Sequence, residues 1–150
     1  MRKITALILL AAIFLSVTPV AAYGQENTTD IIYFNDGSYL TIAINDTYTR
    51  ASGTKTAGKT YQYTDSEGVV AWKIQLTGSF TYTGSTSTCT SSSCNVSIYN
   101  AGWYVISKSA SKSGASAIGD VTMGFKILGI TTKKVPVSMT LTCDANGNLS

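Results

Sequence analysis

Residues 60–84 read TYQYTDSEGVVAWKIQLTGSFTYTG, and this stretch decides the fold class. Apolar side chains recur at every second position from Val70 to Tyr82, with an interruption at Gly78, and mostly polar side chains lie between them. Because side chains along a β-strand alternate between the two faces of a sheet, this period predicts one long strand with one buried face. In a helix the same residues would scatter around the cylinder. Gly78 is the expected site of a bulge or bend.

Turn signals divide the chain on both sides of this strand. Asp65–Gly68 fits a four-residue hairpin turn, and Asn35–Gly37 lies between two apolar runs. Asn, Asp and Gly tolerate the backbone angles of such turns. A third turn is expected at Asn100–Gly102. Residues 45–59 are polar and without period, which indicates a long loop or linker.

Further segments alternate in the same way and predict more strands. One segment carries Val96 and Ile98 and then Trp103 and Val105, and the next places Val121, Met123, Phe125 and Ile127 on one face. The last segment has an inward-facing set of Val135, Val137, Met139, Leu141 and Cys143. Pro136 has the outward parity in the last set. Because proline cannot donate to an inner ladder, this segment is expected to be an edge strand.

These features predict an all-β protein. About seven or eight strands, glycine-bearing turns and the scarcity of helix formers are typical of an antiparallel β-sandwich, and a small β-barrel is the alternative. The expected organisation is a mobile N-terminal segment with a hairpin and a linker over residues 23–58, followed by a single sandwich domain over residues 59–150.

Residues 1–22 have the pattern of a secretory signal peptide. Arg2 and Lys3 precede the apolar run Ile4–Val17, and Val20 and Ala22 fit a signal-peptidase site, with cleavage after Gly24 as the second choice. The run is short for a bilayer-spanning helix, which needs about 20 apolar residues. The expected product is a secreted, soluble, extracellular protein.

Charge and residue types exclude several function classes. Loss of Arg2 and Lys3 leaves nine Lys and Arg against eight Asp and Glu, and no basic cluster alternates with aromatic residues, so no nucleic-acid partner is expected. The chain contains no histidine, which removes histidine-activated nucleophiles and histidine-ligated zinc. The acidic turn Asp144–Asn148 lacks the spacing of a calcium loop. We therefore expect a non-enzyme without metal or cofactor.

Three cysteines allow three pairings, and export favours oxidation. A bridge between Cys89 and Cys94 would close a short loop and contribute about 2 kcal/mol, whereas a bridge from either of them to Cys143 would contribute about 4 kcal/mol. Cys143 continues the inward parity of its strand. Cys89–Cys143 is therefore the favoured disulfide, with the other two pairings left open. Cys94 would then be a free thiol, either exposed or available for a covalent homodimer.

The runs KTYQYTDSEGVVAWKIQLTGSFTYTGSTSTCTSS (59–92), SKSASKSGASA (107–117) and LTCDANGNLS (141–150) carry a resemblance. They resemble a group of small exported proteins of Gram-positive, clostridia-type bacteria to which no activity is assigned. The resemblance covers most of the chain from Lys59 onward and implies a bacterial source and export. The positions of Cys89 and Cys143 fit its pattern, which adds to the case for that pair.

Two functions remain as hypotheses. The first is a secreted, non-catalytic binding module for a cell-surface glycan or protein. Trp72 is expected in the core by its parity, so the candidate binding residues are Tyr61, Tyr63, Trp103 and Tyr104. The second is a membrane-active protein that inserts a β-hairpin, for which Val70–Tyr82 and the small, polar stretch 107–119 are long enough.

Overall fold

The computed structural model describes residues 26–51 and 53–150, so the predicted signal peptide lies outside the described residues. The described chain contains eight β-strands and no helix: β1 (Glu26–Tyr33), β2 (Tyr39–Ala51), β3 (Thr54–Thr64), β4 (Val70–Tyr82), β5 (Ser87–Ile98), β6 (Trp103–Ser113), β7 (Ser116–Ile127) and β8 (Ile130–Thr142). The all-β prediction is confirmed.

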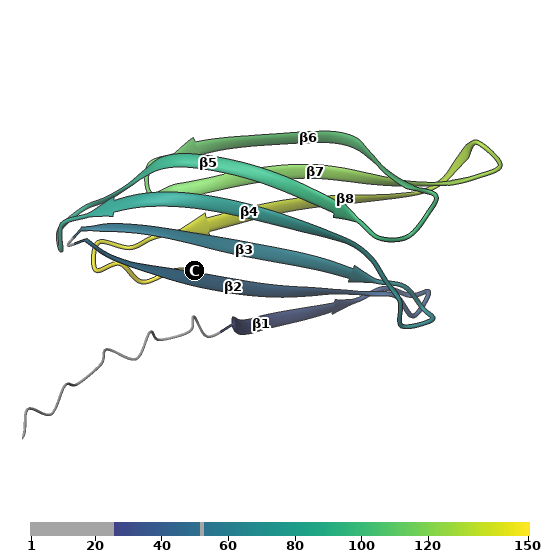
Figure 1. Ribbon diagram of the computed structural model, residues 1–150, viewed down its shortest axis with the longest axis horizontal. Coiled ribbons are helices and arrows are strands. Elements are labelled where there is room, and N and C mark those ends of the chain that lie inside the picture. Colours follow the sequence, from purple (N-terminus) through teal and green to yellow (C-terminus); the bar gives the residue numbers. More distant parts are fainter. Residues whose placement is uncertain (1–25, 52) are drawn as a thin grey trace, which may run out of the picture.

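The strands form two antiparallel sheets (Figure 1). The larger sheet has the order β1-β2-β3-β4-β5 and the smaller sheet the order β6-β7-β8. Each strand pairs with its neighbours in the sequence, except that β5 and β6 belong to different sheets. The described strands do not close into a barrel, so the sandwich prediction is confirmed and the barrel alternative is not formed.

The core lies between the two sheets. On β4 the expected parity is buried, with Trp72, Ile74 and Leu76 fully enclosed and Phe80 1% exposed. On the smaller sheet the inward residues are Val121 and Met123 from β7 and the run from Val135 to Leu141 on β8. Ile127 ends β7 and is 53% exposed, so the burial of this set does not reach the end of the strand. The turn that follows β7 extends beyond the neighbouring strands in Figure 1.

The predicted turns are present. Gly37, Gly68 and Gly102 all have positive φ, near 80–90°. In the first turn the Phe34 amide donates to the Ser38 carbonyl (2.9 Å), and in the second the Asp65 amide donates to the Val69 carbonyl (2.9 Å). At Asn100–Gly102, however, the chain changes sheet instead of closing a hairpin ladder.

The predicted loop over residues 45–59 is wrong, because β2 and β3 run through it and pair from Tyr39–Thr64 onward. The boundary drawn at residue 58 therefore falls inside β3. The stretch lacks apolar alternation, but threonine suits extended backbone and β3 has a hydrogen-bonded partner on each side. Backbone pairing supplies the stability that the side-chain pattern did not indicate.

Gly78 and Pro136 have the structural roles predicted for their types. The ladder between β4 and β5 shifts register next to Gly78, between Ser79 and Phe80. β8 pairs with β7 alone, so Pro136 lies on an edge strand as predicted. On the side of β8 away from β7, a cavity is lined by β8 residues and by residues of the β1–β2 hairpin, and Figure 1 shows β1 and β2 on that side.

Candidate interaction surface

The large apolar side chains that remain exposed gather at one end of the sandwich, which we call the apolar end. They come from the end of β1, the turns between β3 and β4 and between β5 and β6, the start of β6, and the turn between β7 and β8. The exposed set within the described chain is Ile31, Ile32, Tyr33, Val69, Ile98, Tyr99, Val105, Ile106, Ile127, Leu128 and Ile130. Exposed apolar side chains gathered at one end of a molecule are a candidate interaction site.

The β7–β8 turn extends furthest at this end, as Figure 1 shows. Leu128 is 97% exposed, Ile130 is 70% exposed, and Ile127 precedes them. Leu128 has φ of 49°, the only positive value at a non-glycine residue in the described chain. A leucine in this conformation costs about 1–2 kcal/mol compared with a residue that tolerates it. The turn therefore presents exposed apolar side chains, which we call the apolar tip, at a backbone conformation that is unfavourable for leucine.

Three lysines surround this tip. The Lys126 ammonium lies 4.1 Å from the centre of the Tyr104 ring, and the Lys134 side chain is exposed. Lys133 points back towards the body, where its Nζ donates to the Tyr63 hydroxyl (2.6 Å) and pairs with Asp36 in the β1–β2 turn. The apolar tip thus has lysines at its base, and the contacts of Lys133 connect it to the rest of the apolar end.

The Asp36–Lys133 pair perturbs both groups. The hydrogen bond from Lys133 is the main cause that lowers the pKa of Asp36, and bonds from Ser38 add to it. Burial alone would lower the pKa of Lys133, but its hydrogen bonds to Asp36 and Tyr63 outweigh burial and raise it. Both groups are therefore charged at neutral pH, and the pair ties the first turn to β8.

An aromatic cluster supports the apolar end from inside. The Trp72 and Tyr63 rings stack with centroids 5.0 Å apart, and Trp103 lies 5.8 Å from Trp72 and 5.3 Å from Phe125. The prediction of Trp72 as a core residue is confirmed. Offset and edge-to-face aromatic pairs add to burial energy, so the end is a rigid platform.

The four aromatic residues proposed for ligand binding do not form one exposed face. Tyr63 is 2% exposed and Tyr61 is 8% exposed, because both side chains have the inward parity of β3. Neither belongs to an exposed aromatic face, although Tyr61 lines two cavities beside β8. Trp103 is half-buried in the aromatic cluster. The Tyr104 hydroxyl forms a hydrogen bond with that of Thr131 (2.6 Å) on β8. Tyr104 thus stays near the surface at the base of the tip.

The cysteines also differ from the prediction. Cys89, Cys94 and Cys143 are all unbridged and buried. The Cys89 sulfur donates to the Ser91 carbonyl and the Cys143 sulfur to the Asp144 carbonyl, so each points to its own local acceptor instead of to the other. The expected Cys89–Cys143 bridge is not formed. The prediction of an exposed Cys94 is wrong, because it is 7% exposed between β4 and the smaller sheet.

We expect Cys94 to resist alkylation in the folded protein. Burial raises the pKa of its thiol, Lys108 only partly opposes this, and the reactive thiolate is therefore scarce at pH 7. Mass spectrometry after maleimide treatment should show Cys94 unmodified in buffer and modified in urea, which serves as the control. Rapid labelling in buffer, or a reducible dimer through Cys94, would contradict the burial described above.

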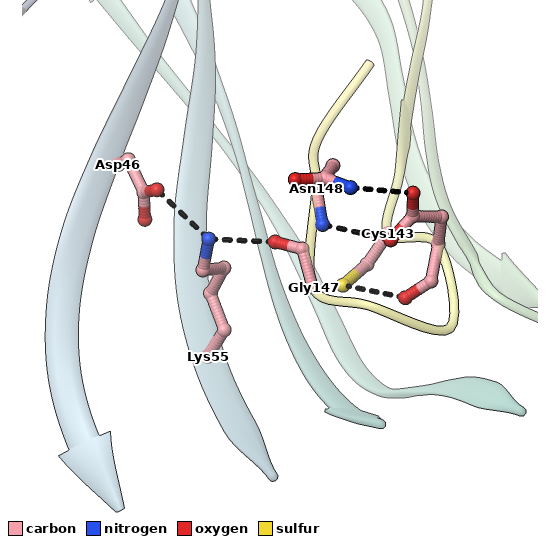
Figure 2. A network of polar contacts seen from close by, with 6 residues as sticks. Asp46, Lys55, Cys143, Gly147 and Asn148 are labelled. Carbon is pink, nitrogen blue, oxygen red and sulfur yellow. Dashed lines mark hydrogen bonds and ion pairs between the residues drawn. The ribbon is translucent and has the colours of Figure 1, made fainter. Parts of the chain in front are cut away.

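The opposite end of the sandwich is polar (Figure 2). Lys55 on β3 donates to the Asp46 carboxylate (2.9 Å) and to the Gly147 carbonyl (2.7 Å) of the C-terminal turn. The Asp144 carboxylate accepts from the backbone amides of Asn146 and Asn148 and from the Asn148 side chain, each at 2.8 Å. These bonds lower the pKa of Asp144, and the hydrogen bond from the Asn148 side chain is the largest cause. This turn is an internally satisfied cap.

Other carboxylates have structural partners as well. Asp65 accepts from two amides of its own turn, and Asp120 accepts from the Ser138 hydroxyl (2.7 Å). Within the described residues, no group of three or more Asp, Glu, Cys or His side chains is placed to hold a metal ion. These carboxylates hold turns and a strand pair together.

The apolar tip was missed in the sequence because ILGI (127–130) continues the apolar run of β7. The signal that could have identified it is the glycine at 129 inside that run, with lysines at 126 and 133–134 on both sides. A turn at this glycine places the apolar residues at a hairpin end. The other turns of the apolar end lie beside this one because consecutive strands run antiparallel, which the sequence of the tip does not indicate.

No helix in the described part of the chain is long and apolar enough to cross a membrane. Comparison with protein-family models, curated proteins and solved structures finds no match to this chain.

Proposed function

We propose that this protein is an exported, non-catalytic binding protein that attaches to a lipid membrane surface through its apolar end. The observation that carries the proposal is the gathering of the exposed large apolar side chains at this end, with Leu128 almost fully exposed at its tip. Burial of one such side chain is worth about 1.5–3 kcal/mol. A tip of three such residues can therefore hold a small protein at a bilayer.

The chemistry of the end favours lipid over a protein partner. The apolar groups lie on convex turns, which enter a fluid apolar phase more readily than they fit a protein surface. Tyr33, Tyr99 and Tyr104 lie at this end, where amphipathic rings suit the headgroup region. Lys126 and Lys134 can meet anionic headgroups while their aliphatic stems stay apolar.

The hairpin-insertion hypothesis has less support. β4 is an inner strand of the larger sheet, with ladders to β3 and β5, so its insertion would break both ladders and expose the core. Attachment through the tip needs no such rearrangement.

We expect Leu128→Asn with Ile130→Asn to reduce vesicle binding at least tenfold, because about 1.4 kcal/mol of lost apolar transfer corresponds to a factor of ten. Cosedimentation with vesicles of phosphatidylcholine and phosphatidylglycerol measures this. Leu128→Asn alone should leave the protein as stable or more stable, because asparagine tolerates positive φ. Binding would then fall while the melting temperature holds or rises.

Ala110→Asn, an exposed polar substitution in the middle of β6, is the matched control and should bind as the wild type does. If the control and the double variant bind equally, or the wild type does not sediment with vesicles, the proposed function is wrong.

A further inference from the structure

The smaller sheet covers only part of the larger one. β8 has a ladder to β7 on one side, and its other side faces the inner surface of β1 and β2. Two neighbouring cavities, of about 380 Å³ and 190 Å³, open along this side, and Tyr61 lines both. The smaller cavity lies between β8 and the β1–β2 hairpin, and the larger one lies next to it, beside Leu149 and Ser150. We call the two cavities together the groove.

The floor of this groove is apolar. Leu40 lines the smaller cavity and Ile42 and Ile44 line the larger, all from the inward face of β2. Val135 and Val137 of β8 line the smaller cavity. Ile44 is only partly buried, and it lies where a further strand beside β8 would cover it.

The wall of the groove offers backbone hydrogen-bonding groups. The amide and carbonyl of Thr142 bond to Ser150 (2.9 and 3.0 Å), and the Thr140 carbonyl accepts from Lys59 (2.9 Å). These groups point away from β7. Because the N–H and C=O groups of every second residue point to the same side of a strand, those of Ser138 and the carbonyl of Pro136 point into the groove as well. No described strand pairs with them.

We propose that this groove is a vacant strand position that receives an extended segment of a partner protein, antiparallel to β8 and with apolar side chains at alternate positions. Leu149 and Ser150 already lie on this edge in extended form, antiparallel to β8, and so begin the ladder that the segment continues. Side chains opposite Val137 and Met139 point to the floor and need to be apolar, whereas those opposite Ser138 point to solvent.

Charge and shape restrict the occupant further. Asp30 lines the larger cavity and forms no ion pair with a described residue, so a basic residue in the segment would meet it. Burial lowers the pKa of Lys59, and the nearby Asp30 works against this. The position is a corner between the edge of β8 and the overhanging β1 and β2. A single strand of about five residues fits such a corner, whereas the sheet of a second folded copy would meet the overhang.

The test uses the peptide KVTVTVT, acetylated and amidated, with titration calorimetry and backbone NMR of the full protein. Saturable binding with slowed hydrogen exchange at the Ser138 amide is expected. The isomer KVVVTTT keeps the composition but loses the alternation of apolar and polar side chains. A KVTVTVT peptide that is N-methylated at its threonines keeps the alternation but loses the amide donors. Each should bind at least tenfold more weakly.

Protein variants locate the site. Ser138→Pro removes one amide donor on the free edge, in the parity where Pro136 is already tolerated, and should weaken KVTVTVT at least tenfold. Ser138→Ala loses the same hydroxyl bond to Asp120 but keeps the amide, and should bind within twofold of the wild type. Ile44→Arg, at the floor, is a second disrupting variant that leaves the edge intact.

Several results would overturn the proposal. They are absence of saturable binding, equal binding of the N-methylated peptide, or equal binding by both Ser138→Pro and Ile44→Arg. A wild-type dimer that Ser138→Pro abolishes would assign the position to a second copy of the chain instead. These results are distinct from vesicle binding, because the groove shares only Ile32 with the apolar end and none of the variants of Ser138 and Ile44 changes a residue of that end.

Discussion

Replacement of Trp72 by alanine is expected to destabilise the protein by about 3–5 kcal/mol, the usual cost of truncating a buried aromatic side chain. Trp72 is fully buried, stacks on Tyr63 at 5.0 Å and meets the edge of Trp103 at 5.8 Å. Its loss removes the centre of the aromatic cluster beneath the apolar end. Urea denaturation followed by circular dichroism measures the change as a shift of the midpoint.

Trp72→Phe is the matched control. The Trp72 indole N–H is buried and has no hydrogen-bond partner. Phenylalanine removes this unpaired donor, whose burial costs about 1–3 kcal/mol, and so offsets part of the lost contact area. The phenylalanine variant should therefore lose much less stability than the alanine variant. Similar midpoints for the two variants would show that the indole ring does not organise the core.

Replacement of Gly78 by alanine is expected to destabilise the protein by about 1–3 kcal/mol through overpacking. A Cβ atom at this position would lie 2.6 Å from Cζ of Phe80 and 2.9 Å from Cβ of Ala117 on the facing sheet. The Phe80 ring folds over the glycine, and Ala117 of the facing sheet lies against it. Either the Phe80 ring or the backbone must therefore shift to make room for the added methyl group. Chemical denaturation should report the resulting loss in the free energy of unfolding.

Gly58→Ala tests this explanation on the adjacent strand. Gly58 is also buried, but its added Cβ would approach the flexible Gln75 side chain at 3.3 Å and the Leu76 carbonyl oxygen at 3.6 Å, which is an ordinary contact distance. Alanine also reduces the entropy of the unfolded chain by about 0.4–1 kcal/mol. We expect little change or a small gain. A loss at position 58 as large as that at position 78 would refute the steric argument.

The candidate site was only partly predictable. The lysines and the apolar residues of the tip are visible in the sequence, but Ile127 was grouped with the apolar face of the preceding strand and no turn was predicted at Gly129. Tyr61 and Tyr63 were expected at a binding face, although they share the inward parity of β3. Parity shows that two side chains lie on the same face, and it does not show whether another sheet covers that face.

The sequence by itself determined the all-β class, the turns at Asn35–Gly37 and Asp65–Gly68, the buried face of β4 and the edge position of β8. These features depend on residues a few positions apart: alternation sets the face, glycine permits positive φ, and proline lacks a donor. Such local rules act before any long-range contact forms. They held at each of these positions.

Only the tertiary structure decided how the eight strands divide into sheets of five and three. The switch at Asn100–Gly102 depends on distant contacts: the amides of Tyr99 and Asn100 donate to the Ala71 carbonyl, and the Lys126 amide donates to the Gly102 carbonyl. The same division leaves β2 uncovered beside β8 and brings four turns to one end. Partners far apart in the chain set these features, and because alternation is the same whichever sheet a strand joins, the sequence pattern cannot distinguish them.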